Sequence, residues 1–217
     1  MSTLNPTISI RTEQTSKMLK NTYMLLGVTV AWSAITAFFG TLANLGLGAN
    51  LVLMLVGFGL LFATYAFKNS SLGLLFIMLF TGIQGFSLGP ILNHYLNMAN
   101  GAEVIMSAAG ATALVFFALS MYVLNTKKDF SFMGGFLMVG IIAFLVLSVV
   151  SIFVQIPMLH MALGYIGVLL FSAFILYDTS NIVNGGEGNY ISATVSLYLD
   201  VLNLFLSLLR VLGGSND

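Results

Sequence analysis

Two aspartates in the last quarter of the chain have the type and spacing that could do chemistry. Asp178 and Asp200 both lie in segments that are otherwise almost wholly apolar. A charge in hydrocarbon costs several kcal/mol unless it faces protein, water or a partner. Either these carboxylates have a function, or the segments that carry them do not cross a membrane.

The chemistry depends on whether the two carboxyl groups meet. Counted from the turn at 184–189, the backbones of Asp178 and Asp200 lie at depths of roughly 8 and 16 Å, at about 1.5 Å per residue. Contact is therefore permitted if the earlier helix is longer or tilted. Two carboxylates in one low-dielectric site hold a proton between them, which makes a pH sensor. They also offer hard oxygen ligands that suit Ca²⁺, at least transiently. The alternative is that hydroxyl or backbone groups satisfy each aspartate separately.

A polar stripe surrounds the second aspartate and predicts where its helix lies. At about 100° per residue, positions i, i+4, i+7, i+11 and i+14 fall on one narrow face of a helix. The residues with this spacing are Ser196, Asp200, Asn203, Ser207 and Arg210. Because the other faces are Leu, Val and Phe, the stripe should point into a bundle, and we predict a central helix.

Composition decides that these segments belong to a membrane protein. Of the 217 residues, 59% are hydrophobic and only 6% are charged, whereas an average soluble domain has about 25% charged residues. A bilayer core of about 30 Å needs roughly 20 apolar helical residues per crossing. The length therefore suits about seven spans, and the partners are to be sought in the lipid bilayer. The net charge of zero, with no dense basic run, argues against nucleic acid.

The fold class predicted is an all-α integral membrane protein, a seven-transmembrane-helix bundle whose seventh helix is central and polar-striped. The helices are expected near 21–43, 50–67, 72–96, 102–124, 132–155, 159–183 and 190–212. We expect residues 1–20 to form a cytoplasmic tail, residues 21–212 a single transmembrane domain, and residues 213–217 a short C-terminal tail.

The basic residues predict the orientation. Short loops rich in Lys and Arg stay in the cytoplasm, and all but Arg210 fall in the tail or in loops on one side: Arg11, Lys17, Lys20, Lys68, Lys127 and Lys128. The N-terminus is therefore expected in the cytoplasm and the C-terminus outside. The first apolar run is too long for a signal-peptide core, so we interpret it as a retained span.

A glycine face in the third segment predicts close helix packing. Gly82, Gly85 and Gly89 fall on one side of a helix, and the missing Cβ atoms let another backbone approach. Pro90 removes a backbone donor, so a kink is expected there. The alternative is a binding site in the unwound turn.

Catalytic signatures are missing from the sequence. It contains no cysteine, which excludes thiol chemistry and disulfides. His94 and His160 have no spacing typical of a metal site, and the usual catalytic motifs do not occur. We therefore predict neither an enzyme nor a resident cofactor.

The same residues resemble a known family. The runs 175–183, 185–190 and 193–210 are similar to the Bax inhibitor-1 family of membrane proteins, and 81–92 and 127–132 match it too. The similarity covers nearly the whole chain after residue 17, and the last sixty residues are its most specific part.

The resemblance implies a seven-helix bundle in which six helices surround the last. It also implies an aspartate pair that senses pH in a Ca²⁺ leak, which falls here on Asp178 and Asp200. In some members an arginine late in the second helix engages that pair. Lys68 is the nearest cation here, and as a point donor it cannot make the bidentate fork of arginine.

Two functions follow as hypotheses for a protein of the bacterial inner membrane. The main one is a pH-sensitive Ca²⁺ leak. The alternative comes from a bacterial branch of the family, which includes proteins that bind and restrain an AAA membrane protease of the FtsH type. In that case the polar N-terminal segment would be offered to the protease.

Overall fold

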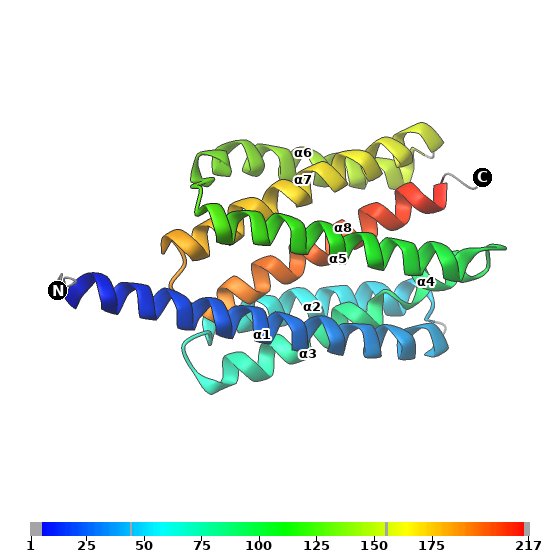
Figure 1. The fold of residues 1–217 in the computed structure, drawn as a ribbon. Helices are drawn as coiled ribbons and strands as arrows, with labels where there is room; N and C mark the ends of the chain where they lie inside the picture. The colour runs from blue at the N-terminus through cyan, green and yellow to red at the C-terminus, as the bar shows by residue number, and fades with distance from the viewer. Residues whose placement is uncertain (1–5, 44, 155, 215–217) are drawn as a thin grey trace. The chain divides into compact units, whose positions relative to one another are not determined.

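The computed structural model describes the backbone of residues 6–43, 45–154 and 156–214, and the side chains of 13–43, 45–46, 48–154 and 156–214. Its helices, in chain order in Figure 1, are α1 (Pro6–Ala43), α2 (Leu47–Ala66), α3 (Ser71–Ser87), α4 (Gly89–Leu96), α5 (Gly101–Thr126), the short 3₁₀ turn η1 (Ser131–Met133), α6 (Gly134–Phe153), α7 (Pro157–Asn184) and α8 (Tyr190–Gly214).

The described residues contain seven helical stretches long and apolar enough to cross a membrane. These are Glu13–Ala43, Gly48–Ala66, Ser71–Leu96, Gly101–Thr126, Ser131–Phe153, Pro157–Asn184 and Tyr190–Gly214. The prediction of an all-helical, seven-span fold is therefore confirmed. It succeeds because each crossing needs a run of about 20 apolar residues, and such runs can be located along the sequence.

The first helix begins much earlier than predicted. α1 starts at Pro6 instead of residue 21, so most of the expected tail is helical. Proline suits the first position of a helix, because its missing N–H would have no helical partner there. The residues that follow are mostly polar, but residues 7–20 include neither proline nor glycine, so nothing there interrupts the helix. The expectation for residues 1–5 and for the side chain of Arg11 lies outside the described residues.

The third span is divided into two helices at the glycine–proline pair. α3 ends at Ser87, Leu88 donates its N–H to the Gly85 carbonyl at 2.9 Å, and α4 begins at Gly89. Pro90 stands in the first turn of α4, where a helix tolerates a missing N–H.

The chain forms two compact units. The first consists of the described residues up to Pro90 together with Asn181–Tyr198, and the second of Ile91–Ser180 together with α8 from Leu199 onward. α7 and α8 therefore each contribute a segment to both units.

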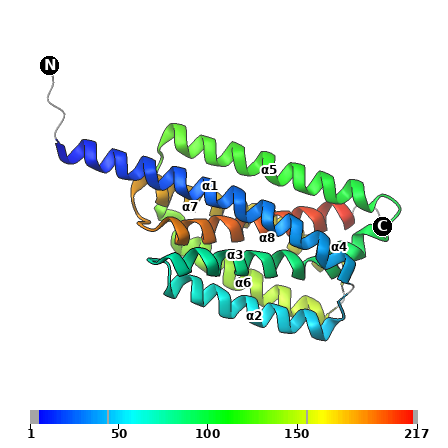
Figure 2. The same cartoon turned by 90° about the horizontal axis from the view of Figure 1, so that it is seen from below.

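In the first unit, α3 packs against both α1 and α2, which lie beside it in Figures 1 and 2. The glycines of this span let it approach α1 closely. A Cβ built on Gly85 would meet the backbone of Ser33, and one on Gly89 would meet the backbone of Gly40. Backbone-to-backbone approach of this kind is how helices associate in lipid, where no hydrophobic force drives them together.

The α8 segment of the first unit is buried on all sides. Five consecutive residues, Ile191–Val195, are each at most 2% exposed. Because successive helical residues point about 100° apart, a run of buried residues means that protein surrounds the helix. This agrees with the prediction of a central last helix.

In the second unit, a small apolar cluster joins α5 to α8. Val104 and Ala108 of α5 pack with Leu209 of α8, and Tyr95 of α4 is among the residues that cover this cluster. α6 meets α7 through an edge-on pair, Phe144 and Phe171, with ring centroids 5.4 Å apart.

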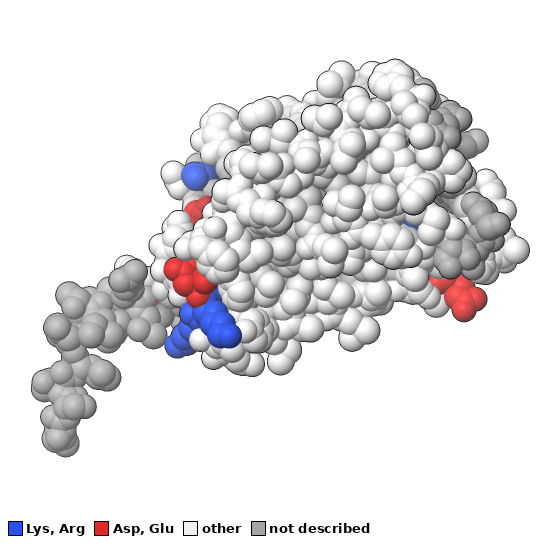
Figure 3. Space-filling model, turned by 90° about the horizontal axis from the view of Figure 1, so that it is seen from above, with Lys and Arg blue, Asp and Glu red and all other residues white. Residues whose placement is uncertain are grey.

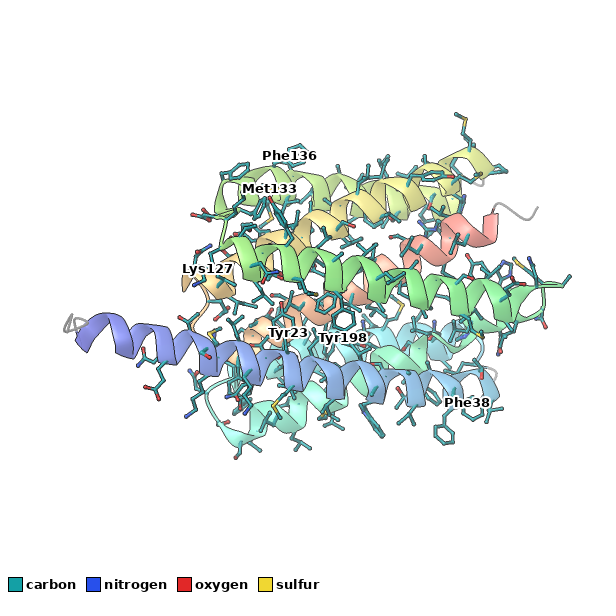
Figure 4. The ribbon with its side chains drawn as sticks, viewed as in Figure 1. Tyr23, Phe38, Lys127, Met133, Phe136 and Tyr198 are labelled. Carbon is teal, nitrogen blue, oxygen red and sulfur yellow. The ribbon has the colours of Figure 1, made fainter. Side chains whose placement is uncertain are left out.

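Large apolar side chains face outward over both units. Phe38 of α1 is 61% exposed and Phe136 of α6 is 74% exposed, and both are labelled in Figure 4. On the face shown in Figure 3, acidic and basic atoms lie mainly near the two ends, and the broad surface between them carries almost none. A soluble protein rarely exposes so much contiguous apolar surface, so this surface is suited to hydrocarbon.

Candidate functional site: a carboxyl pair on α7 and α8

The structure brings the two aspartates together within the second unit. Asp178 of α7 and Asp200 of α8 share a side-chain hydrogen bond. An ionised carboxylate only accepts hydrogen bonds, so a bond between two carboxyl groups requires a proton on one of them. The pair can therefore exchange a proton, and full ionisation would place two negative charges side by side.

The environments of the two carboxyls differ. Asp200 is 6% exposed, whereas Asp178 is only partly buried. Among the described residues, Asp200 Oδ2 has no hydrogen-bond partner. A buried polar atom without a partner is uncommon in native proteins and often marks a functional group or a water site.

Two glycines allow α7 and α8 to approach each other along the polar stripe. A Cβ built on Gly167 of α7 would lie 3.0 Å from Ser207 Cβ, and one on Gly164 would lie 2.9 Å from Val211 Cγ2. We did not single out these glycines in the sequence. Helical spacing could have identified Gly167, because it lies eleven residues before Asp178 and therefore on nearly the same helix face.

The middle of the stripe is satisfied by its own helix. Asn203 Nδ2 donates to the Leu199 carbonyl and Ser207 Oγ donates to the Asn203 carbonyl, each at 2.7 Å. Ser196 belongs to the first unit and is partly buried. The ionisable side chains of the stripe are therefore Asp200 and Arg210. The polar side chains between them donate hydrogen bonds to carbonyls of α8 itself.

Ser180 anchors the α5–α6 connection to α7, two residues after Asp178. Its hydroxyl donates to the Lys128 carbonyl at 3.2 Å and accepts from the Phe130 N–H at 2.9 Å. In this loop Ser131 donates its N–H to Asp129 Oδ1 at 2.8 Å. This bond, with further bonds from the Ser131 and Ser180 hydroxyls, lowers the pKa of Asp129. The sequence did not reveal this anchor.

The other predicted site residues lie elsewhere. Lys68 follows α2 in the first unit, is partly buried, and accepts a hydrogen bond on its carbonyl from Asn189 Nδ2 at 3.0 Å. Gly82 packs against the Trp32 ring of α1, with 2.6 Å from a built Cβ to Nε1. A role for Lys68 as a latch cation stays a prediction.

Within the described residues, the pair is not part of a larger set of metal ligands. The described residues contain no group of three or more His, Cys, Asp or Glu side chains that could hold a metal ion. Resident Ca²⁺ takes about six to eight oxygen ligands. Two carboxyls therefore suit a passing ion better than a bound one.

Comparison with known proteins gives a consistent result. The family model described as inhibitor of apoptosis-promoting Bax1 matches residues 15–217. A protein of Escherichia coli K12 named modulator of FtsH protease YccA is 52% identical over 200 residues, which cover 92% of this chain and 90% of the relative. Its counterpart in E. coli O6:H1 is named inner membrane protein YccA. An uncharacterised membrane protein of Vibrio cholerae is 48% identical over 95% of this chain and 93% of its own length.

Proposed function

The chain belongs to the Bax inhibitor-1 family, and on that premise we propose that it modulates an FtsH-type AAA protease of the bacterial inner membrane. The observation that carries this proposal is the 52% identity, over 92% of the chain, to a protein named as a modulator of that protease. We assign the chain no catalysis of its own, since the relative is named as a modulator of a protease.

The shape of α1 supports this proposal. The span from Glu13 continues a helix that begins at Pro6, and Glu13, Gln14, Ser16, Lys17 and Lys20 are exposed on it. A membrane-anchored protease can reach such a polar segment where it leaves the bilayer. We assign residues 1–17 as the segment that the protease engages, on the cytoplasmic side.

Co-purification from membranes tests the assignment. The full chain with a C-terminal tag should capture the protease, and a chain that lacks residues 2–17 should not. A variant with Lys127→Gln and Lys128→Gln is the matched control, because it removes basic charge from a loop predicted on the same side and leaves α1 intact. Failure of the full chain to associate in detergent, or to cross-link in membranes, would contradict the proposal.

A second candidate is a pH-sensitive Ca²⁺ leak, which the Asp178–Asp200 hydrogen bond favours. Loss of the shared proton would set two negative charges against each other on α7 and α8, which gives the helices a reason to move apart. A low-dielectric surrounding strengthens that repulsion.

Liposomes that contain a Ca²⁺ indicator test the leak. The rate of Ca²⁺ entry should vary with pH in the unchanged protein and lose that dependence in Asp178→Asn and in Asp200→Asn. Asp129→Asn is the control, because this aspartate is exposed and lies in a loop outside the spans. An unchanged pH profile in both pair variants would exclude the pair as sensor.

A further inference from the structure

Arg210 lies at the opposite end of the α8 stripe from Ser196. Neither of the functions proposed above uses this residue. It lies four residues before the last residue of α8, Gly214, at a depth of about 6 Å from the helix end at about 1.5 Å per residue. Its side chain is partly buried. Gly164 of α7 lies against the first part of the side chain, because a Cβ built on it would be in ordinary contact with Arg210 Cγ, at 3.5 Å.

Within the part of the chain that the structure describes, the guanidinium has no carboxylate partner. The neighbouring titratable group is the phenol of Tyr95 on α4, not a carboxylate. Arginine cannot lose its proton in a protein, so the charge persists wherever the side chain is held. A partly buried charge of this kind needs an anion or water to offset the cost of leaving bulk solvent.

Tyr95, the neighbour of Arg210, packs against several other residues. Its ring covers the apolar cluster of Val104, Ala108 and Leu209, and it lies so close to Gly213 that a Cβ there would overlap Tyr95 Cε1. The Tyr95 ring therefore forms one wall of the Arg210 environment, packed directly against the α8 backbone at Gly213.

We propose that Arg210, beside Tyr95, binds the phosphate group of a membrane phospholipid. The planar guanidinium matches phosphate with two parallel N–H donors. The depth favours a lipid over a soluble anion: the polar headgroup layers add about 5–8 Å on each side of the hydrocarbon core. An arginine about one turn from the end of a spanning helix lies within reach of that layer. The outward surface of the neighbouring α7 turn is apolar, with Tyr165 and Ile166 exposed, which suits the acyl chains of such a lipid.

Native mass spectrometry of the whole protein in detergent tests this site, with phosphatidylglycerol as the probe. The unchanged protein should retain a phosphatidylglycerol adduct, and Arg210→Gln should weaken its apparent affinity at least tenfold. Arg210→Lys keeps the charge and removes the fork, so a smaller loss of at least threefold is expected, and this variant keeps the test decisive if Arg210→Gln does not fold. Lys128→Gln is the control, because that exposed lysine lies in the α5–α6 loop.

Two competitors identify the ligand. Diacylglycerol, which lacks the phosphate, should bind weakly and equally to the unchanged protein and both arginine variants. Inorganic phosphate at the same concentration should not displace the lipid. Equal retention of phosphatidylglycerol by the unchanged protein and both arginine variants would overturn the site, and displacement by inorganic phosphate would overturn the assignment to a lipid.

Discussion

Two kinds of hydrogen-bonded hydroxyl group can be distinguished among the described residues, according to what they bond. Thr29, Thr81 and Thr112 donate to carbonyls of their own helices, three or four residues back. Such bonds satisfy a polar group in an apolar interior without linking one helix to another. The hydroxyls of Ser33, Tyr198 and Ser180 instead join separate helices or loops.

Tyr198 joins three helices of the first unit. Ser33 Oγ of α1 donates to the Thr81 carbonyl of α3 at 2.6 Å and lies 2.6 Å from the Tyr198 hydroxyl of α8. The phenol, labelled in Figure 4, also donates to the Thr81 carbonyl at 3.3 Å. Its ring meets Phe80 edge-on, with centroids 5.8 Å apart.

Tyr198→Phe should therefore lower the free energy of unfolding by about 1 kcal/mol. The ring contact with Phe80 is kept, and Ser33 still bonds Thr81, so the loss is that of the phenol's contacts with Ser33 and Thr81. An interhelical hydrogen bond averages about 0.6 kcal/mol in membranes, with a maximum near 1.7. Reversible unfolding in mixed micelles measures it. Tyr165→Phe, at a position 53% exposed on α7, should change nothing measurable. Equal effects at both positions would show that the bonds to Ser33 and Thr81 contribute no stability.

The α1–α3 contact depends on the absence of side chains. At Gly85 a built Cβ would meet the Ser33 carbonyl oxygen and Thr36 Oγ1, and would lie 2.7 Å from Ser33 Cα. Backbone atoms of a helix cannot rotate away as the end of a long side chain can, so the helices themselves would have to separate. At Gly59 of α2, by contrast, the built Cβ meets nothing within 4 Å.

The two glycines should therefore respond to alanine in opposite directions. Gly85→Ala should destabilise the protein by about 1–3 kcal/mol, the usual cost of overpacking. Gly59→Ala should be neutral or stabilising by up to about 1 kcal/mol, because alanine favours a helix more than glycine does. Thermal unfolding in detergent compares them directly. A Gly85→Ala protein as stable as the Gly59→Ala protein would mean that α1 and α3 do not approach as closely as described.

At the scale of the whole molecule, the spans could be predicted and several of their boundaries could not. The thickness of the hydrocarbon core requires long apolar runs, and these runs located seven crossings in the sequence. The start of α1 was wrong because apolarity marks where a helix enters the membrane, while the helix itself continues through polar residues back to Pro6. Helix propensity and the lack of a breaking residue decide that boundary.

The candidate site, too, could be predicted only in part from the sequence. Periodicity alone placed Asp200 and Arg210 on one face of the last helix. Contact between Asp178 and Asp200 depends on how α7 and α8 are tilted and how closely they pack, which Gly164 and Gly167 allow. The bonds of Ser33 to Tyr198 and of Ser180 to Lys128 join residues distant in sequence. A pattern along one chain segment carries no information about such pairs.

Orientation in the bilayer is the remaining property of the whole chain, and the charge distribution predicts it. The loops that follow the second and fourth spans carry Lys68, Lys127 and Lys128. The connections at 97–100 and 154–157, which follow the third and fifth spans, contain neither Lys nor Arg. Because basic loops stay in the cytoplasm, the N-terminus should be cytoplasmic, and an odd number of spans then places the C-terminus outside.

The cysteine-free sequence makes this prediction directly testable with single substitutions. Ser16→Cys and Asn125→Cys should react with a membrane-impermeant maleimide only after the cells are permeabilised, whereas Ala99→Cys and Met158→Cys should react in intact spheroplasts. All four positions are exposed, so differences in labelling report the side of the membrane and not burial. The unchanged protein supplies the background, since it has no thiol to label. The reverse pattern would place the exposed polar segment of α1 outside the cell, out of reach of a cytoplasmic protease domain, and would contradict the proposed engagement of residues 1–17.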